Sequence, residues 1–378
     1  MLFLRAKGVD VLYKELNALL EELTNNKIIP AVSMSIGYMS EIIYSESFGE
    51  IAERNKKICN NTRFDIASMT KILTGICFIK LVEEGKVSLS DPICDIFPEF
   101  NNKKPIEKDG CIVGYCDSSK ITWYNVLTHT SGMGWTRSKT RPSLPNLDKG
   151  LSDIYNMPFA YVPGEHIVYS DIPIILMGKA IEQLSNMKLD DFVDKVLCKP
   201  LNMKNTSFLR ISNNTMDKAL IAPTEEDLIF RKRRVWGEVH DENAYLLDGV
   251  SAHAGIFSTS EDMCNLAIHY NNWLHNDGIL KKESVKQMIF EHVEENGDRR
   301  GLIWQLSGDG EKAYTKNLSR DAYGHAGFTG CFLWNDPVTS LSIVFLSNDV
   351  YNGRDNRKLF DYRSRIMNIA IKDTLGGI

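Results

Sequence analysis

The fold of this chain is decided by one stretch, Phe64-Asp65-Ile66-Ala67-Ser68-Met69-Thr70-Lys71-Ile72-Leu73-Thr74-Gly75. It places a serine and a lysine three positions apart at the start of a predicted buried helix, where residues three apart lie on one face. A serine hydroxyl is a weak nucleophile until a base removes its proton, and a lysine can do so when burial or a nearby cation lowers its pKa. The helix N-terminus adds unpaired N–H groups and a partial positive charge, which stabilise an oxyanion. Ser68 and Lys71 are therefore a candidate nucleophile and base, although such a pair also occurs by chance and needs support from other stretches.

The length and composition are those of an ordinary globular protein. The chain has 378 residues, of which 43% are hydrophobic and 25% charged, enough for one large domain or two with a substantial core. The net charge of -5 gives no reason to expect a nucleic-acid partner. The one basic cluster, residues 231–234, follows three acids at 225–227 and is interpreted as a solvated surface.

The eight cysteines and the first residues bear on the cellular compartment. The cysteines are scattered and form no Cys-x-x-Cys pair, which is unlike a zinc site, a redox motif or a disulfide framework and predicts reduced thiols. The apolar start, Met1-Leu2-Phe3-Leu4, is cut short by Arg5 and Lys7, whereas a signal peptide needs a longer apolar run after its positive charge. No later segment is long and apolar enough to span a membrane. We therefore expect a cytoplasmic protein without membrane contact.

Hydrophobic spacing predicts the elements of the N-terminal quarter. Apolar residues at helical spacing predict an amphipathic helix over 9–24. Alternation of apolar and small residues over 32–38 predicts a half-buried strand, and a second strand over 41–48 completes a hairpin. The helix that carries Ser68 is then expected to run to Gly85, a residue type that suits a C-cap.

Residues 88–300 are predicted to consist mostly of helices and long loops. Thr122 is the expected N-cap of a short helix over 123–127. Residues 136–150 are polar, contain two prolines and are expected to form a surface loop. Apolar periodicity predicts further helices near 171–185, 189–197 and 260–275.

Strands return at the C-terminus. Segments 331–334 and 338–346 flank the turn signal Asn335-Asp336-Pro337, and a last helix is expected over about 356–372. Strands at both ends with helices between them predict an α/β fold of the α+β type, in which one antiparallel sheet is built from both chain ends and flanked by helices. We expect a single domain over 1–378, with a sheet-bearing lobe from about 9–85 and 300–378 and an inserted, mostly helical lobe from about 88–300.

Two further stretches support a catalytic role for Ser68. The first, Pro163-Gly164-Glu165-His166-Ile167-Val168-Tyr169-Ser170-Asp171, precedes an apolar helix, and a tyrosine beside a lysine can act as a general base because the cation lowers the pKa of the phenol. The second, Gly324-His325-Ala326-Gly327-Phe328-Thr329-Gly330, leads into a strand, where small residues let a substrate approach the backbone.

Together, these stretches resemble the motifs of the penicillin-recognising serine hydrolases, which include class C β-lactamases, D-alanyl-D-alanine carboxypeptidases, and related esterases and D-aminopeptidases. That family carries Ser-x-x-Lys, then Tyr-x-Asn or Tyr-Ser-x, then Lys/His-x-Gly, in this order. This chain has Ser68 and Lys71, then Tyr169-Ser170-Asp171, then His325-Ala326-Gly327. Two flanking stretches also match the family, at 127–132 and 253–259.

The resemblance implies a role for each residue of the three motifs. Ser68 would attack a carbonyl and form an acyl-enzyme, Lys71 would activate Ser68, and Tyr169 would pass a proton to the leaving group. His325 would contact the substrate or support Tyr169. The backbone N–H groups of Ser68 and Phe328 would form the oxyanion hole, and no metal or other cofactor is implied. The implied substrate-binding and oxyanion residues are Ser68, Phe328, Asp171, Ala326 and Gly327.

Two residues depart from the common pattern of the family. His325 stands where a lysine often binds a substrate carboxylate, and a histidine, with an ordinary pKa of about 6.5, is mostly neutral at pH 7. Asp171 stands where asparagine is common in class C enzymes, and a carboxylate facing the site would further disfavour anionic substrates. Together with the missing export signal, these departures favour the esterase and aminopeptidase branches.

Other candidate residues are interpreted as structural. His129, His240 and His253 are expected to satisfy backbone groups. A zinc site formed by His240, Asp241 and His253 is not expected, because the chain has no His-x-x-x-His spacing. The tryptophans assigned to core or rim packing are Trp135, Trp236 and Trp304.

We therefore expect a cytoplasmic serine hydrolase that cleaves small ester or amide substrates through a Ser68 acyl-enzyme. A true β-lactamase or D-alanyl-D-alanine carboxypeptidase is the second hypothesis. A catalytically silent binding or regulatory protein on the same fold is the third, and the intact Ser68, Lys71 and Tyr169 argue against it. The expected partner is a small ester, amide or peptide substrate, and the sequence leaves the oligomeric state open.

Overall fold

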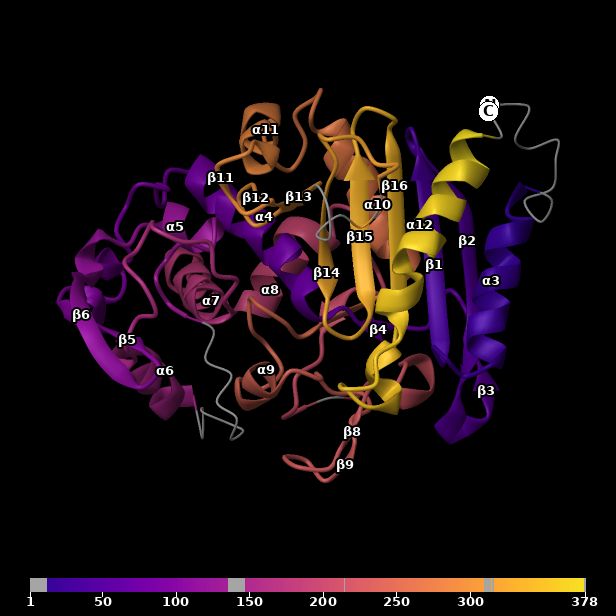
Figure 1. Cartoon of the computed structure of the whole chain (residues 1–378), viewed down its shortest axis with the longest axis horizontal. Coiled ribbons are helices and arrows are strands. Elements are labelled where there is room, and N and C mark those ends of the chain that lie inside the picture. The colour runs from indigo at the N-terminus through magenta and orange to yellow at the C-terminus, as the bar shows by residue number, and fades with distance from the viewer. Residues whose placement is uncertain (1–11, 135–146, 214, 309–313, 315, 377–378) are drawn as a thin grey trace.

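The structure is built around one large antiparallel sheet. The computed structural model describes residues 12–376 except 135–146, 214, 309–313 and 315. The strands of the sheet are β1 Ala31–Tyr38, β2 Glu41–Ile51, β3 Lys56–Lys57, β11 Val293–Glu295, β12 Asp298–Arg300, β13 Gln305–Leu306, β14 Tyr323–Gly327, β15 Cys331–Asp336 and β16 Leu341–Ser347. Within the described residues they are ordered β11-β12-β13-β14-β15-β16-β1-β2-β3, and β1 pairs antiparallel with β16 at the centre (Figure 1). The prediction of an antiparallel sheet built from both chain ends is therefore confirmed.

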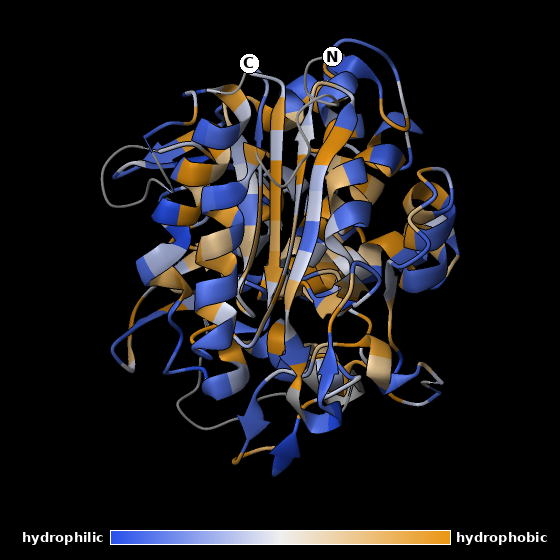
Figure 2. Cartoon of the chain, turned by 90° about the vertical axis from the view of Figure 1, so that its right-hand side faces the viewer, coloured by the Kyte–Doolittle hydropathy of each residue, from blue (hydrophilic) through white to orange (hydrophobic). Residues whose placement is uncertain are grey.

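Helices cover both faces of the sheet, as Figures 1 and 2 show. The helices α3 (Lys14–Asn25) and α12 (Leu359–Leu375) lie against one face and bury an apolar cluster that includes Leu20 and Phe345. The helix α10 (Ser260–Asn272) packs against β1 from the other face. Because β1 is covered on both sides, all but its last residue are buried. The prediction that this strand is half-buried is therefore wrong.

Small polar side chains allow β1 to be buried on both faces. The hydroxyls of Ser33 and Ser35 each lie 2.8 Å from the Ser260 hydroxyl at the start of α10. Ser35 also lies 3.1 Å from the hydroxyl of Ser45 on β2. A buried hydroxyl is tolerated when it is hydrogen-bonded. The polar residues Ser33 and Ser35, which predict a solvent-facing side of β1, are thus buried and hydrogen-bonded beneath α10.

The helix α4 (Thr70–Glu83) is buried along almost its whole length, and further helices follow it in the chain. Their bounds are α5 Trp123–Leu127, α6 Leu147–Asn156, α7 Ile172–Ser185, α8 Leu189–Val193, α9 Glu242–Leu246 and α11 Lys282–Ile289. The helix α4 packs against α7 and α8 and follows a 3₁₀ turn, Ala67–Met69, that holds Ser68. Gly85 comes after the helix with a φ of +69°, the left-handed conformation expected just past a helix C-terminus.

The region predicted to be mostly helical, 88–300, also contains short strands. The strands β5 (Lys103–Lys108) and β6 (Cys111–Asp117) form a hairpin, and β11 and β12 extend the main sheet from within this region. The other short strands are β4 Phe64–Asp65, β7 Ser207–Phe208, β8 Glu226–Asp227, β9 Arg233–Arg234 and β10 Ile256–Ser258. Most of these strands have two or three residues, which is too few for an alternating pattern to be recognised in the sequence.

Predicted element boundaries mostly agree with the structure to within a few residues. The hairpin at Asn335-Asp336-Pro337 forms, but its second strand begins at Leu341 because the turn continues through Ser340, which has a φ of +55°. The short helix after Thr122 is confirmed. The side-chain oxygen of Asn125 accepts hydrogen bonds from both the backbone N–H and the hydroxyl of Thr122, each at 3.0 Å.

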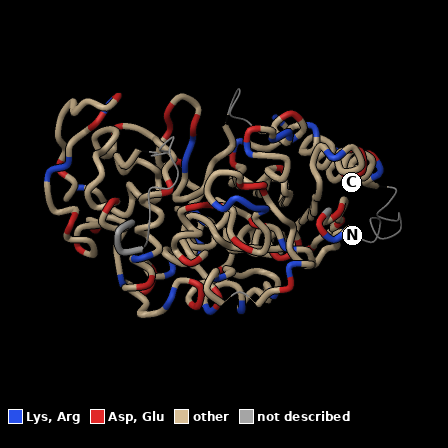
Figure 3. Tube along the Cα trace, turned by 90° about the horizontal axis from the view of Figure 1, so that it is seen from below, with Lys and Arg blue, Asp and Glu red and all other residues tan. Residues whose placement is uncertain are grey.

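Some sequence predictions fall outside the described residues. These are the first residues of the predicted helix over 9–24, Trp135 and most of the predicted loop over 136–150, whose last four residues begin α6. Along the described trace, positive and negative residues are interspersed (Figure 3). None of the described helices combines the length and the apolar composition needed to cross a membrane.

Candidate active site

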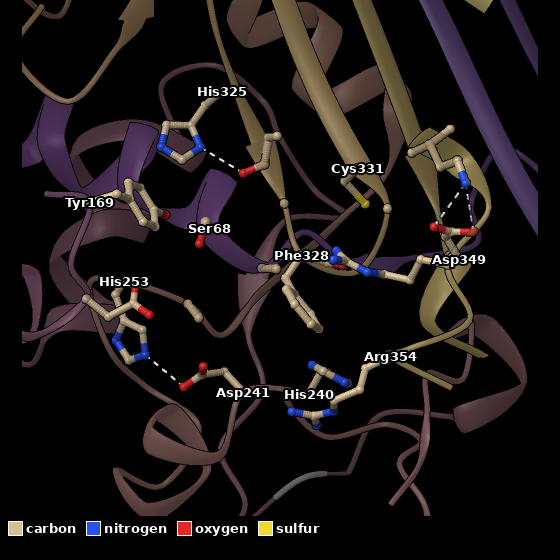
Figure 4. A pocket seen from close by; sticks show the side chains of 18 of the residues that line it. Ser68, Tyr169, His240, Asp241, His253, His325, Phe328, Cys331, Asp349 and Arg354 are labelled. Atoms are coloured by element: carbon tan, nitrogen blue, oxygen red, sulfur yellow. Dashed lines mark hydrogen bonds and ion pairs between the residues drawn. The ribbon is translucent and has the colours of Figure 1, made fainter. Parts of the chain in front are cut away.

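Ser68 lies on a strained turn just before α4. Ala67 has a φ of +46°, which is uncommon for a residue with a side chain. The buried carboxylate of Asp65 holds this conformation, since it accepts the Ala67 N–H at 2.8 Å and the His240 N–H at 2.6 Å. The turn places Ser68 in the wall of a cavity of about 300 Å³ (Figure 4).

Lys71 lies in the first turn of α4, and its fully buried side chain points toward Ser68. Its Nζ donates to Ser68 Oγ at 2.8 Å and to the His253 carbonyl at 3.1 Å, and it forms an ion pair with Asp171 at 2.7 Å. Burial is the largest single influence and lowers the pKa of Lys71, but the contacts with Asp171 and Tyr169 together outweigh burial, so the pKa is raised. The predicted pairing with Ser68 is therefore present, whereas the expectation of a lowered lysine pKa is not met, because Asp171 supplies a counter-charge.

Tyr169 joins this group from the loop before α7. Burial raises the pKa of Tyr169, and the nearby Lys71 ammonium and the contacts of the phenol with Lys71 and Ser68 lower it only in part. The ring centroid lies 4.9 Å from Lys71 Nζ. The resting site consequently holds a neutral phenol, an ammonium group and the carboxylate of Asp171.

Asp171 immediately precedes α7 and points its carboxylate at Lys71. The side chain is 20% exposed, and its charge is paired with that of the buried Lys71 ammonium, 2.7 Å away. The sequence predicts that a carboxylate here disfavours anionic substrates. In the structure, that charge is matched by the ammonium of Lys71, so Asp171 gives little reason to exclude an anionic substrate.

His325 lies on β14 and is neutral. Burial lowers the pKa of its imidazole to about 3, with the charges of Lys71 and Arg300 adding to the effect. Its Nδ1 lies 2.8 Å from the Ala326 carbonyl oxygen, which can only accept, so Nδ1 carries the proton. Among the described residues, Nε2 is buried and has no hydrogen-bond partner. His325 therefore offers a lone pair, and not a positive charge, beside the Tyr169 ring, whose centroid is 5.9 Å away.

Gly327 and Phe328 bring the end of β14 against the turn that holds Ser68. A Cβ atom on Gly327 would lie only 2.4 Å from the Ile66 carbonyl oxygen, so only glycine allows this close approach. Phe328 follows directly, and both Phe328 and Ser68 line the cavity (Figure 4). The predicted oxyanion residues are thus neighbours in space although they are far apart in the sequence.

Asp241 and His253 form a hydrogen-bonded pair on another wall of the cavity (Figure 4). His253 Nε2 lies 2.8 Å from Asp241 Oδ1, and its Nδ1 lies 2.8 Å from the Ser251 hydroxyl. One ligand atom each from Asp171, Asp241 and His253 lie within 4.8 Å of one another. Lys71 already pairs with Asp171, and His253 with Asp241, so these donors have protein partners. The zinc-site trio considered from the sequence was His240, Asp241 and His253. In the structure, His240 Nε2 instead lies 3.1 Å from the Glu225 carboxylate.

Of the other residues interpreted as structural, His240 and His253 line the cavity, whereas His129 and the two described tryptophans pack against neighbouring side chains or backbone. His129 is buried beside Tyr169, with the two ring centroids 4.7 Å apart and the rings tilted by 41°. His240 and His253 both line the cavity, which sequence reasoning did not foresee. Trp304 is buried and donates its N–H to the Tyr270 hydroxyl at 3.0 Å, and Trp236 donates to the Ile221 carbonyl at 2.8 Å.

Arginines are the main feature of the cavity that sequence reasoning missed. Arg300 lines it beside His325, with its guanidinium 5.8 Å from the Tyr169 ring and its Nε 2.8 Å from Asp298. Three more arginines line the opposite part, namely Arg354, Arg357 and Arg363. They lie outside the three motifs. A weak signal was available, since cations crowd the start of the last helix, where the helix dipole favours anions.

The fold and this serine-lysine-tyrosine site define a serine hydrolase. A family model described as Beta-lactamase matches residues 16–366. The chain therefore belongs to the β-lactamase family, as the motifs predict.

Known relatives agree with this assignment. A protein of Salmonella enteritidis PT4 named Putative D-alanyl-D-alanine carboxypeptidase is 29% identical over 329 residues, which cover 79% of this chain and 72% of that protein. Among solved structures, EstCE1, described as a hydrolase with promiscuous acyltransferase activity, has a TM-score of 0.73 at 20% identity and covers 93% of this chain and 98% of its own. D-alanine carboxypeptidase AmpC from Burkholderia cenocepacia has a TM-score of 0.71 at 19% identity and covers 98% of this chain and 99% of its own. At these identities the two structures establish the shared fold alone.

Proposed function

We propose that this protein hydrolyses small ester or amide substrates through an acyl-enzyme formed on Ser68. The observation that carries the proposal is the position of Ser68 Oγ, 2.8 Å from Lys71 Nζ in the wall of a cavity that Tyr169 also lines. A nucleophile within hydrogen-bond reach of its proton acceptor, with that acceptor oriented by a third group, is the arrangement that nucleophilic catalysis requires. Asp171 and the His253 carbonyl are the orienting groups for Lys71.

The proton path starts from a protonated lysine. As Ser68 attacks the substrate carbonyl, its proton passes to Lys71 while Lys71 passes a proton to Asp171, 2.7 Å away. The backbone N–H groups of Ser68 and Phe328 stabilise the oxyanion. Tyr169 then donates its phenol proton to the leaving group, and the departure of that group leaves an acyl ester on Ser68. Lys71 reprotonates Tyr169 and recovers its own proton from Asp171.

The second half-reaction reverses these transfers. A water molecule attacks the acyl-enzyme and gives a proton to the Tyr169 and Lys71 network, and Ser68 Oγ recovers a proton as it leaves the acyl carbon. The products are a carboxylic acid and the restored resting site. His325 Nε2 accepts a hydrogen bond from the substrate, because its Nδ1 proton already faces the Ala326 carbonyl.

A D-alanyl-D-alanine carboxypeptidase is the second candidate, favoured by the names of the Salmonella relatives. Such a substrate ends in a carboxylate, and the neutral His325 is a poor anchor for it. Arg300 is a cation on the same wall of the cavity and could take that role, although Asp298 already neutralises part of its charge. Release of D-alanine from an N-acyl-D-Ala-D-Ala peptide, lost in Arg300→Gln while hydrolysis of a neutral ester persists, would favour this candidate.

The proposal is tested by covalent labelling. The protein is incubated with a fluorophosphonate and, separately, with a penicillin, and its intact mass is measured beside the Ser68→Ala variant. A phosphonate adduct that disappears in Ser68→Ala, together with turnover of a p-nitrophenyl ester, is the expected result. A stable or hydrolysed penicillin adduct would move the assignment to the β-lactamase and carboxypeptidase branch. No adduct with either reagent would make a silent binding protein the better explanation.

We also propose that the protein works in a reducing compartment such as the cytoplasm. All eight cysteines lie within the described residues and are free thiols. Five of them are buried, where they act as small apolar side chains. Cell fractionation with an antibody against the protein tests this proposal, and recovery outside the cytoplasmic fraction would refute it.

A further inference from the structure

Two arginines at the start of α12 form one wall of the cavity. Arg357 and Arg363, which we call the arginine wall, both line it and are half-buried. In Figure 4, Tyr169 and His325 lie on one side of Ser68, whereas Phe328, Asp349 and Arg354 lie on the other. Arg357 stacks on the Phe328 ring, with its guanidinium carbon 4.2 Å from the ring centroid. Arg357 is therefore on the side of Ser68 away from Tyr169. The Phe360 ring lies between the two arginines, with its centroid 5.7 Å from the Arg357 guanidinium carbon and 4.4 Å from that of Arg363.

The charges of the arginine wall are not matched by nearby acids. Among the described residues, neither Arg357 nor Arg363 has a carboxylate within ion-pair distance. Arg357 donates to the Phe328 carbonyl at 3.2 Å. Arg354 is different, because it pairs with Glu225 at 2.5 Å and with Glu242 at 2.7 Å.

Asp349, an acid close to Arg357, is already committed to the backbone. It is 2% exposed, and its Oδ1 accepts the N–H groups of Lys358 at 3.0 Å and Leu359 at 3.2 Å. These bonds cap the start of α12 and leave the carboxylate facing the helix. The cations of the wall therefore remain available to a ligand in the cavity.

Aromatic rings hold the two guanidinium groups in place. Arg363 lies 4.5 Å from the Tyr314 ring centroid and 4.4 Å from that of Phe360. Stacking fixes the plane of a guanidinium without using all of its five N–H donors, and Arg363 also hydrogen-bonds the Tyr314 phenol. A guanidinium edge matches a carboxylate, with which it forms paired charge-assisted hydrogen bonds.

We infer that the arginine wall binds a carboxylate carried by the acyl part of the substrate. In the proposed function, on which this inference rests, Tyr169 protonates the leaving group, so the leaving group lies on the Tyr169 side of Ser68. The acyl part then extends past Phe328 toward Arg357 and Arg363. The substrates are accordingly half-esters or half-amides of dicarboxylic acids, with a free carboxylate several bonds from the carbonyl that is attacked.

The test compares two esters that differ in one charge. The charged ester is p-nitrophenyl hydrogen adipate, and the neutral one is p-nitrophenyl methyl adipate. Their kcat/KM ratio is measured for the wild type, Arg357→Gln, Arg363→Gln and the control Arg365→Gln. Arg365 is exposed on the same helix and does not line the cavity. The suberate pair repeats the comparison with a longer acyl chain.

We expect the wild type to prefer the charged ester by about tenfold or more, a preference that falls about tenfold in either wall variant and persists in Arg365→Gln. The ratio corrects for any general loss of activity, because both esters share the leaving group. A wild-type ratio near one, or a ratio that both wall variants keep, would overturn the inference.

A binding measurement separates this inference from the proposed function. Adipic acid mono-anilide and its methyl ester are titrated calorimetrically into Ser68→Ala, with and without Arg357→Gln. Tighter binding of the charged anilide that is lost with Arg357→Gln supports the arginine wall even if the wild type hydrolyses neither ester. Equal binding of both anilides overturns the inference, even if a fluorophosphonate labels Ser68.

Discussion

Replacing Gly327 by alanine tests whether the site depends on the close approach of β14 to the Ser68 turn. A Cβ on residue 327 would lie 2.4 Å from the Ile66 carbonyl oxygen, whereas ordinary contact begins at 3.4 Å. The strand must therefore move by the difference, 3.4 − 2.4 = 1.0 Å, away from the turn. A displacement of this size between a nucleophile and its oxyanion donors lowers the rate by about 100-fold. This corresponds to about 2.7 kcal/mol of transition-state stabilisation.

The assay is kcat/KM on p-nitrophenyl acetate, measured beside Gly114→Ala as the matched control. Gly114 also lies in a strand, β6, but a Cβ there would meet nothing within 4 Å, so its replacement is expected to be silent. Circular dichroism and a urea titration show whether Gly327→Ala is folded, since overpacking of this kind costs about 1–3 kcal/mol of stability. A folded Gly327→Ala that keeps more than about a third of the wild-type kcat/KM would refute the reasoning.

Four further predictions concern the charges of the site. Asp171→Asn removes the carboxylate that accepts a proton from Lys71 in the proposed path, so kcat/KM is expected to fall by about 100-fold or more, and a variant with the wild-type kcat/KM would contradict that path. Because the pKa of Lys71 in the folded protein is raised above 10.5, the ion pair with Asp171 stabilises the fold below that pH, and this stabilisation disappears as the pH rises through the raised pKa. Urea titrations at alkaline pH are therefore expected to show a smaller decline in the free energy of unfolding for Asp171→Asn than for the wild type. Lys71→Met is expected to lower kcat/KM by about 100-fold or more and to abolish fluorophosphonate labelling, and labelling at the wild-type rate would remove Lys71 from the activation of Ser68. In the folded protein the pKa of His325 is about 3, whereas the pKa of a histidine in the unfolded chain is about 6.5. The free energy of unfolding is therefore expected to fall as the pH drops from about 6.5 toward 3. NMR of the imidazole tests this, and titration near pH 6.5 in the folded protein would show that His325 is not buried as described.

Local patterns predicted the parts of the site that lie close together in the sequence. Ser68 and Lys71 are three residues apart on one helical segment, and their atoms meet at 2.8 Å. The end of that helix at Gly85 and the short helix after Thr122 were predictable for the same reason, since helix ends depend on adjacent residues.

Burial was harder to predict, because it depends on what packs against an element. The alternating strand β1 has the pattern of a half-exposed strand, yet α10 covers its polar face and satisfies Ser33 and Ser35 through Ser260. The hairpin of β5 and β6 was missed, since its register is set by pairing and not by a clear hydrophobic alternation.

The electrostatics of the site were decided by contacts between distant segments. Lys71 has a raised pKa because Asp171, which lies 100 positions later, is 2.7 Å from it. His325 has a lowered pKa because the sheet buries it near Lys71 and Arg300. The composition of a sequence window contains neither burial nor long-range charge, so both shifts required the folded structure.

The sequence by itself determined the nucleophile, its lysine, the order of the three motifs and the sheet that joins both chain ends, because these follow from spacing along the chain. Only the tertiary structure decided the charge state of the site and the make-up of the cavity. Arg357 and Arg363 belong to no motif, and they reach the cavity only because α12 packs back across the sheet. Charge and access are properties of the whole fold, since each depends on every group that packing brings near a side chain.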